Sequence, residues 1–134
     1  MDPAVPLIVV ADRDRMHERL VTAGLGQLGY EAKPARDPAT LQKVVDEVRC
    51  VDALLVDLAM FGNSVMFLNR VIFAHRPLLV VLMLGLGTGL SPDVARTSGF
   101  DACFSKIVDV KRLDRFLRDH LPLSRRPRQI TQAL

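Results

Sequence analysis

The sequence has few cysteines, no tryptophan and no long apolar run, and each shortage excludes a class of protein. Its two cysteines, Cys50 and Cys103, are widely spaced, and the whole chain has three histidines. This spacing favours neither a disulfide framework nor a zinc site, and we expect both cysteines to be small buried apolar residues. The longest apolar run, Leu78 to Leu84, is far shorter than the roughly 20 residues of a membrane span, so we expect no membrane partner.

The chain also lacks a targeting pattern at its start. It begins Met-Asp-Pro, without a basic leader or a small-residue cleavage site. We therefore expect a cytoplasmic protein.

An excess of charge is confined to one end of the sequence. All 15 acidic residues lie between Asp2 and Asp119, together with 15 of the 18 basic residues, so the net charge of +3 comes from Arg125, Arg126 and Arg128. We divide the chain into a domain of residues 1–122, for which we expect no nucleic-acid binding, and a basic tail or linker of residues 123–134. The tail arginines could contact phosphate groups of nucleic acid or of a cyclic dinucleotide, and the plainer interpretation is a linker or a disordered end.

Short apolar, β-branched runs alternate with helical patterns along the chain. Strands are predicted over residues 7–11, 31–34, 51–56, 78–84 and 100–105, and helices over 14–28 and after Asp37-Pro38, Ser64, Ser91-Pro92 and Asp109. Five strand–helix units predict an α/β fold with a parallel sheet covered on both faces. We expect the flavodoxin-like doubly wound fold, with the strand order 2-1-3-4-5.

Helical spacing assigns an inward face to four of the predicted helices, those over 14–28 and after Asp37-Pro38, Ser64 and Asp109. In the first helix, we expect Met16, Leu20, Val21, Leu25 and Leu28 on the apolar side. The third has an inward row of Val65, Leu68, Val71 and Ile72, and it also carries Met66 and Phe73. These two residues are core residues, single apolar residues on the surface, or an exposed stripe for a partner helix.

Three acidic residues and a lysine come at the ends of predicted strands. Asp12 and Asp14 follow the first strand, Asp57 the third and Lys106 the fifth. Because ligands of such sheets bind beyond the carboxyl ends of the strands, these side chains define a candidate site. Asp57 could accept a phosphoryl group beside a Mg²⁺ held by Asp12, with Lys106 neutralising charge. The plain alternative is a salt bridge between Asp57 and Lys106 without chemistry.

These residues stand in segments that resemble a known family. From about Pro6 to Leu121 the sequence is similar to the receiver domains of two-component response regulators, through Val9-Val10-Ala11-Asp12, Asp57-Leu58-Ala59-Met60, Ser98-Gly99-Phe100-Asp101 and Ser105-Lys106. The resemblance implies that Asp57 is the phosphorylated aspartate and that Lys106 contacts the phosphoryl group. It also implies that Asp12, Asp57 and the backbone carbonyl of Ala59 hold Mg²⁺.

The sequence departs from the pattern of that family at several positions. Ala11 replaces the first residue of an acidic pair, and Leu84 stands where a Thr or Ser hydroxyl is usual. Cys103 replaces an aromatic residue, and Ile107 replaces the proline after the lysine. The resemblance therefore implies an atypical receiver that has lost the usual hydroxyl-to-aromatic coupling.

The glycine-rich loop Gly85 to Gly89 allows two interpretations. Its backbone amides could cradle a phosphate, although a mobile connection is the plainer interpretation. A register shifted by four residues would bring Thr88 to the place of the missing hydroxyl.

Two functions follow from these observations. The first is an atypical receiver in phosphorelay signalling that uses Mg²⁺ and a histidine kinase or phosphotransfer protein as partner. The resemblance also implies a homodimer through the fourth and fifth helices. The second is a phosphorylation-independent pseudo-receiver, acting as a protein-interaction or nucleotide-ligand-binding module. We do not expect an enzyme, because no histidine, serine or cysteine is placed by spacing to act with Asp57.

Overall fold

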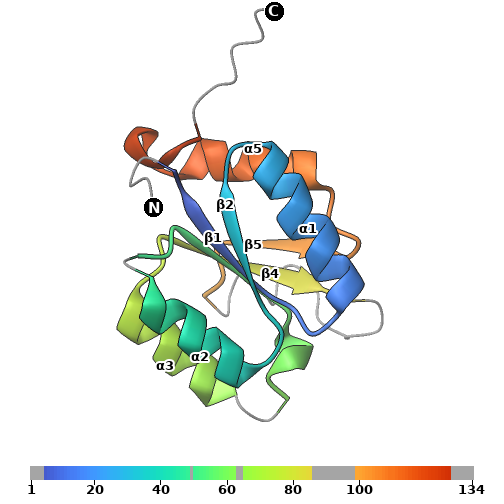
Figure 1. Ribbon diagram of the computed structural model, residues 1–134, viewed down its shortest axis with the longest axis vertical. Coiled ribbons are helices and arrows are strands. Elements are labelled where there is room, and N and C mark those ends of the chain that lie inside the picture. Colours follow the sequence, from blue (N-terminus) through green and yellow to red (C-terminus); the bar gives the residue numbers. More distant parts are fainter. Residues whose placement is uncertain (1–4, 49, 63–64, 86–98, 128–134) are drawn as a thin grey trace, which may run out of the picture.

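The strands of the chain form one parallel sheet (Figure 1). The computed structural model describes residues 5–48, 50–62, 65–85 and 99–127. The sheet has the order β2-β1-β3-β4-β5, as predicted, and is made of β1 (Leu7–Ala11), β2 (Glu31–Ala35), β3 (Ala53–Val56), β4 (Leu79–Leu84) and β5 (Ala102–Ser105). Four α-helices are described, α1 (Arg15–Gln27), α2 (Pro38–Glu47), α3 (Val65–His75) and α5 (Val110–His120), together with two 3₁₀ turns, η1 (Leu58–Met60) and η2 (Leu123–Arg125). The Ser64 cap, residues 86–89 and the helix expected after Ser91-Pro92 lie outside the described residues.

Aspartates begin three of the helices, as the sequence predicts. The Asp14 carboxylate accepts the N–H of His17 at 3.1 Å at the start of α1. Asp37 caps α2 in the same way, at 2.7 Å from the Thr40 N–H, and Asp109 caps α5. Each carboxylate satisfies a backbone donor that has no partner within the helix. The caps therefore fix where the chain leaves the carboxyl end of one strand and turns into the next helix.

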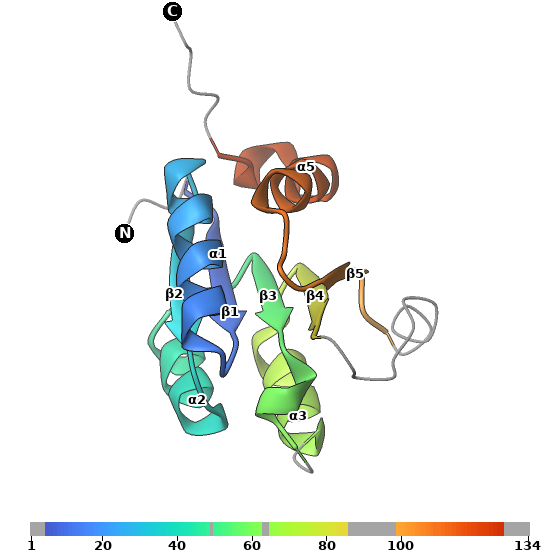
Figure 2. The same cartoon turned by 90° about the vertical axis from the view of Figure 1, so that its right-hand side faces the viewer.

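Helices cover both faces of the sheet. α1 and α5 lie on one face, and α2 and α3 lie on the other (Figures 1 and 2). Side chains alternate between the two faces along each strand, so Ile8 and Val10 of β1 join one core while Val9 and Ala11 join the other. This burial on both faces explains why β1, β3 and β4 are continuous apolar runs.

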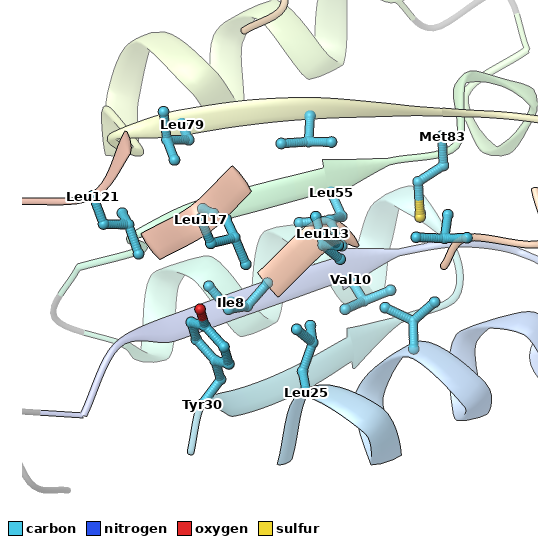
Figure 3. Packing of buried hydrophobic residues seen from close by; sticks show 14 residues of the cluster. Ile8, Val10, Leu25, Tyr30, Leu55, Leu79, Met83, Leu113, Leu117 and Leu121 are labelled. Atoms are coloured by element: carbon cyan, nitrogen blue, oxygen red, sulfur yellow. The ribbon is translucent and has the colours of Figure 1, made fainter. Parts of the chain in front are cut away.

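The core beneath α1 and α5 contains six leucines among its 14 buried residues. Figure 3 shows Leu113 and Leu117 of α5 against Ile8, Val10 and Leu55 of the sheet, beside Leu25 of α1 and Tyr30. All these residues are at most 4% exposed. On the opposite face, a second core gathers residues of α2 and α3, among them Leu41, Val45, Leu68 and Val71. The two cores pack the sheet between its helices on both faces.

The expected inward face of α1 is wrong for two residues. Met16 is 77% exposed and Leu20 is 53% exposed, whereas His17, Val21 and Leu25 are buried. The row at i, i+4 and i+8 that starts at His17 faces the sheet. His17 can be buried in this row because its ring forms hydrogen bonds with Asp12 and Val108. Burial of a polar side chain is acceptable when its polar atoms are paired.

Two further expectations about exposure can be compared with the structure. Cys50 is exposed, so its expected burial is wrong, and Cys103 is half-buried. Met66 and Phe73 of α3 are each 75% exposed, so their interpretation as core residues is wrong.

The C-terminal segment contacts the domain at the amino end of the sheet. Arg125 forms an ion pair with the buried Asp52, and the Arg126 Nε donates to the Leu121 carbonyl at 2.9 Å. Pro127 is buried, and its carbonyl accepts a hydrogen bond from Arg118. The boundary between residues 122 and 123 stays a prediction, but residues 123–127 are not a free end. Arg128 lies outside the described residues.

No helix in the described ranges is long and apolar enough to cross a membrane.

Candidate functional site

Three of the predicted site residues extend the hydrogen bonding of the sheet beyond its strands. The N–H of Asp12 donates to the Ala35 carbonyl at 3.0 Å, and that of Asp57 donates to the Ala11 carbonyl at 2.8 Å. The N–H of Lys106 donates to the Leu84 carbonyl at 2.7 Å. Each residue is therefore fixed by a neighbouring strand, and all three lie at the carboxyl edge of the sheet. This is the edge at which ligands of doubly wound folds bind.

The side chains of these residues meet in one cluster. The Lys106 Nζ lies 2.8 Å from the Asp12 Oδ1 and 3.3 Å from the Asp57 Oδ2. Asp12 is fully buried and Asp57 is 4% exposed, while the lysine side chain keeps 14% of its surface exposed. One ammonium group thus serves two buried carboxylates. The structure contains the salt bridge between Asp57 and Lys106 and adds Asp12 to it.

Sequence reasoning missed His17, which completes the cluster. Its Nδ1 lies 2.6 Å from the Asp12 Oδ2, and its Nε2 accepts the N–H of Val108 at 3.1 Å. A ring nitrogen that accepts a hydrogen bond carries no proton, so the contacts assign the neutral tautomer with the proton on Nδ1. The available signal was the helical spacing, because His17 lies four residues before Val21 in the inward row of α1.

Hydrogen bonds keep Asp12 ionised despite its burial. Burial alone would raise the pKa of this carboxyl group. The hydrogen bonds from Lys106, His17 and the backbone of Asp14, together with the charge of Lys106, outweigh burial and lower the pKa below its usual value. Asp12 is therefore a charged group with both oxygens occupied by donors.

A cavity of about 320 Å³ opens above Asp57. Its described lining comes from the loops that follow β1, β3, β4 and β5: Arg13, Asp14, Asp57, Ala59, Gly85, Lys106 and Ile107. The Asp57 Oδ1 accepts the Ala59 N–H at 3.1 Å, while its Oδ2 faces Lys106. The predicted residues Asp57, Ala59 and Lys106 thus line one space, with Asp12 buried beside it.

Of the departures from the receiver pattern, Ile107 lines this cavity, and Leu84 directly precedes the lining residue Gly85. Leu84 ends β4 and is 7% exposed, so this strand end offers an apolar side chain. Cys103 packs near Leu82 and Leu84, and Ile107 is 75% exposed after a cis peptide bond from Lys106. Thr88, the alternative source of a hydroxyl group, lies outside the described residues.

The carboxylate oxygens of Asp12 and Asp57 are the type of ligand that a hard divalent cation prefers. Across the described ranges, no group of three or more His, Cys, Asp or Glu side chains is arranged to hold a metal ion. Asp12 and Asp57 nevertheless provide two carboxylates, and Ala59 lines the same cavity. Mg²⁺ typically uses one or two carboxylates, with waters and a substrate phosphate as its other ligands. The residues present fit such an ion, although Lys106 holds both carboxylates in this structure.

Comparison with known proteins identifies the fold of this chain. No protein-family model matches the sequence, and a search of curated proteins finds no match. Among solved structures, the signal receiver domain of a DNA-binding response regulator from Colwellia psychrerythraea 34H is similar at 21% identity and a TM-score of 0.71, covering 85% of this chain and 96% of that chain. A response regulator receiver protein from Burkholderia phymatum has 18% identity and a TM-score of 0.72, covering 88% and 99%.

A third similar structure holds ligands. It is a response regulator from Burkholderia pseudomallei with a phosphorylated aspartic acid, a calcium ion and citrate, at 18% identity and a TM-score of 0.69, covering 88% of this chain and 67% of that chain. The strand order and these similarities show that the chain has the flavodoxin-like fold of response-regulator receiver domains.

Proposed function

We propose that this protein is a receiver domain of phosphorelay signalling and that it accepts a phosphoryl group on Asp57. The observation that carries the proposal is the position of the Asp57 carboxylate. It is fixed at the end of β3, lines the cavity and has its Oδ2 3.3 Å from the Lys106 Nζ. A carboxylate can act as a nucleophile and form an aspartyl phosphate.

In the proposed step, an oxygen of Asp57 attacks the phosphorus of a phosphohistidine on a histidine kinase or phosphotransfer protein. The O–P bond forms as the P–N bond breaks, and the electron pair of that bond stays with the imidazole nitrogen. Lys106 holds positive charge beside the acceptor oxygen throughout the step. Fixed charge of this kind stabilises the transferring group without reorganisation.

Asp12, Asp57 and the backbone carbonyl of Ala59 would hold Mg²⁺ at this site. When bound, the ion offsets the negative charge of the phosphoryl oxygens. The calcium ion and phosphorylated aspartate of the Burkholderia pseudomallei response regulator support a divalent cation with this fold. His17 orients Asp12 from behind, since its Nδ1 holds the Oδ2 of that carboxylate at 2.6 Å.

Intact-mass measurement with a small phosphodonor tests the proposal. The protein is incubated with acetyl phosphate and Mg²⁺, and amide NMR spectra are recorded with beryllium fluoride and Mg²⁺. We expect a mass increase of one phosphoryl group and saturable shifts around Asp57. Absence of both would refute the proposal.

Two variants locate the modified residue. Asp57→Asn removes the proposed acceptor and abolishes the mass increase. Asp119→Asn is the matched control, because Asp119 is an exposed aspartate on α5 outside the lining of this cavity, and it should keep the mass increase. A mass increase that persists in Asp57→Asn would place the modification elsewhere.

A second candidate function is the phosphorylation-independent pseudo-receiver. The occupied oxygens of Asp12 and the apolar end of β4 at Leu84 favour it. It predicts that Asp57→Asn leaves partner binding unchanged, whereas the first function predicts that this variant no longer responds to phosphodonor. The homodimer through the fourth and fifth helices stays a prediction, because the segment of the fourth helix lies outside the described residues.

A further inference from the structure

Arg13 is the second positive charge beside the proposed acceptor. Among the described residues that line the cavity, the cationic side chains are Arg13 and Lys106. They come from the loops after β1 and β5, which lie on opposite sides of β3 in the order of the strands. A group bound on Asp57 would therefore have a cationic residue on either side.

Lys106 alone is poorly matched to a phosphorylated Asp57. Its ammonium already contacts Asp12 at 2.8 Å and Asp57 at 3.3 Å. A phosphoryl group carries about −2 charge when fully ionised. His17 adds no charge in its assigned tautomer, because its Nε2 accepts the Val108 N–H. The same lysine would have to serve Asp12 and the added phosphoryl oxygens.

Among the described residues, the end of β4 adds no side-chain donor to the cavity. Leu84 is apolar, and Gly85, which lines the cavity, has no side chain. Arg13, on the β1 side of β3, lines the same cavity and can donate to a phosphoryl oxygen on Asp57. A guanidinium group presents paired N–H donors that match phosphoryl oxygens in a bidentate arrangement.

The backbone around Arg13 is fixed on both sides. The N–H of Asp14 donates to the Asp12 Oδ1 at 2.9 Å, and the Asp14 Oδ1 accepts the His17 N–H at 3.1 Å. Arg13 therefore stands between an aspartate of the cluster and the cap of α1. Less conformational freedom is lost when its side chain binds an anion, because the backbone is already ordered.

We infer that Arg13 binds the phosphoryl group of the donor and of phosphorylated Asp57, from the β1 side of the cavity. This inference rests on the proposed function and names a residue of the same site. With an acyl phosphate as donor, the Asp57 O–P bond forms while the P–O bond to the acyl group breaks. The electron pair leaves with the donor carboxylate, and no proton transfer is required of Arg13.

The test compares two neighbouring arginines. Arg13→Gln removes the charge in the cavity, and Arg15→Gln removes an exposed charge at the start of α1, outside the cavity lining. For each protein, the rate of phosphorylation is measured against acetyl phosphate concentration, and the affinity for beryllium fluoride with Mg²⁺ is measured by NMR. We expect Arg13→Gln to weaken beryllium fluoride binding roughly tenfold, which corresponds to about 1.4 kcal/mol. Arg15→Gln should bind as the unchanged protein does.

A third variant controls for folding and charge. Arg13→Lys restores the charge without the planar fork, so we expect intermediate affinity. If Arg13→Gln binds and reacts like the unchanged protein, the inference is overturned while the proposed function stands. If the unchanged protein neither reacts nor binds beryllium fluoride, both are overturned. Equal weakening in Arg13→Gln and Arg15→Gln would indicate a general charge effect and would also overturn the inference.

Discussion

The Arg125 guanidinium group forms a bidentate ion pair with the Asp52 carboxylate. Its Nε lies 2.8 Å from the Asp52 Oδ1, and its Nη2 lies 2.7 Å from the Oδ2. The same Oδ2 accepts the Leu7 N–H at 2.7 Å. A residue that follows α5 thus joins the starts of β1 and β3, at the edge of the sheet opposite to the proposed site.

Substitution of Arg125 should destabilise the fold. Arg125→Gln leaves the carboxylate of Asp52, which is 1% exposed, without its cation. Loss of one partner of a buried pair costs roughly 3–5 kcal/mol, and we expect about 2–3 kcal/mol here because the arginine side chain is partly exposed. Urea unfolding measures the change.

A double-mutant cycle separates this pair from a general loss of charge. Asp52→Asn combined with Arg125→Gln should cost less than the two single substitutions added together. Arg19→Gln, an exposed arginine on α1, is the control and should change stability by less than about 0.5 kcal/mol. Additive effects at Asp52 and Arg125 would contradict a direct interaction.

The limits of the folded domain can be tested by truncation. A chain ending at Pro122 loses Arg125 and the Pro127 carbonyl that accepts from Arg118 at 3.3 Å. A chain ending at Arg128 keeps both contacts. We expect the shorter chain to unfold at lower urea concentration by at least the Arg125→Gln effect. Equal midpoints for the two chains would support a domain boundary at residue 122.

Tyr30 provides a prediction about alkaline pH. Its hydroxyl donates to the Asp114 Oδ1 at 2.7 Å. Burial, followed by the hydrogen bond to Asp114 and the charge of that group, raises the pKa of Tyr30 well above its usual 10.0, although Arg118 opposes the shift. The unfolded chain releases this proton near pH 10.0. The contribution of Tyr30 to the free energy of unfolding is therefore complete below that pH and decreases as the pH rises above it.

The titration of Tyr30 can be followed directly by absorbance, because the chain has one tyrosine and no tryptophan. Tyrosinate absorbance in the native protein should appear well above pH 10.0 or only on unfolding, and in denaturant it should appear near pH 10.0. Asp114→Asn should shift the native midpoint downward, whereas Asp119→Asn, an exposed residue on α5, should not. A native midpoint near 10.0 would show that Tyr30 is not buried against Asp114.

The contacts of His17 predict its tautomer. Nitrogen NMR at neutral pH should show a protonated Nδ1 and an unprotonated Nε2, because the Nε2 accepts the Val108 N–H. His17→Leu should cost about 1–3 kcal/mol, since the buried Asp12 loses one of its donors. His75, which contacts Asp46 on the surface, serves as the internal comparison in the same spectra. An unprotonated Nδ1 would contradict the contact with Asp12.

The sheet and its caps were predictable from the sequence because their signals are local. Apolar runs such as residues 79–84 mark strands that are covered on both faces, and an aspartate at Asp14 or Asp109 marks the start of a helix. The meeting of Asp12, Asp57 and Lys106 follows from strand order, since parallel strands end at one edge of the sheet.

The missed features depend on partners that are distant along the chain. His17 is buried because Val108, 91 residues later, donates to it, while hydropathy ranked Met16 as the more apolar neighbour. The pairing of Asp52 and Arg125 spans 73 residues and leaves no periodic pattern. Local sequence patterns predict that such polar residues are exposed to solvent. Their burial becomes clear only when the positions of both partners in the fold are known.

Because Lys106 lies between Asp12 and Asp57, a change that increases the stability of the domain should decrease its affinity for a cation. The contact that shields two buried carboxylates in the resting protein must loosen before those carboxylates can accept a cation. A stronger contact between Lys106 and the two carboxylates therefore makes the empty domain more stable and makes cation binding weaker. Variants of Lys106 or its neighbours that bind a cation more tightly should accordingly be found among the less stable ones.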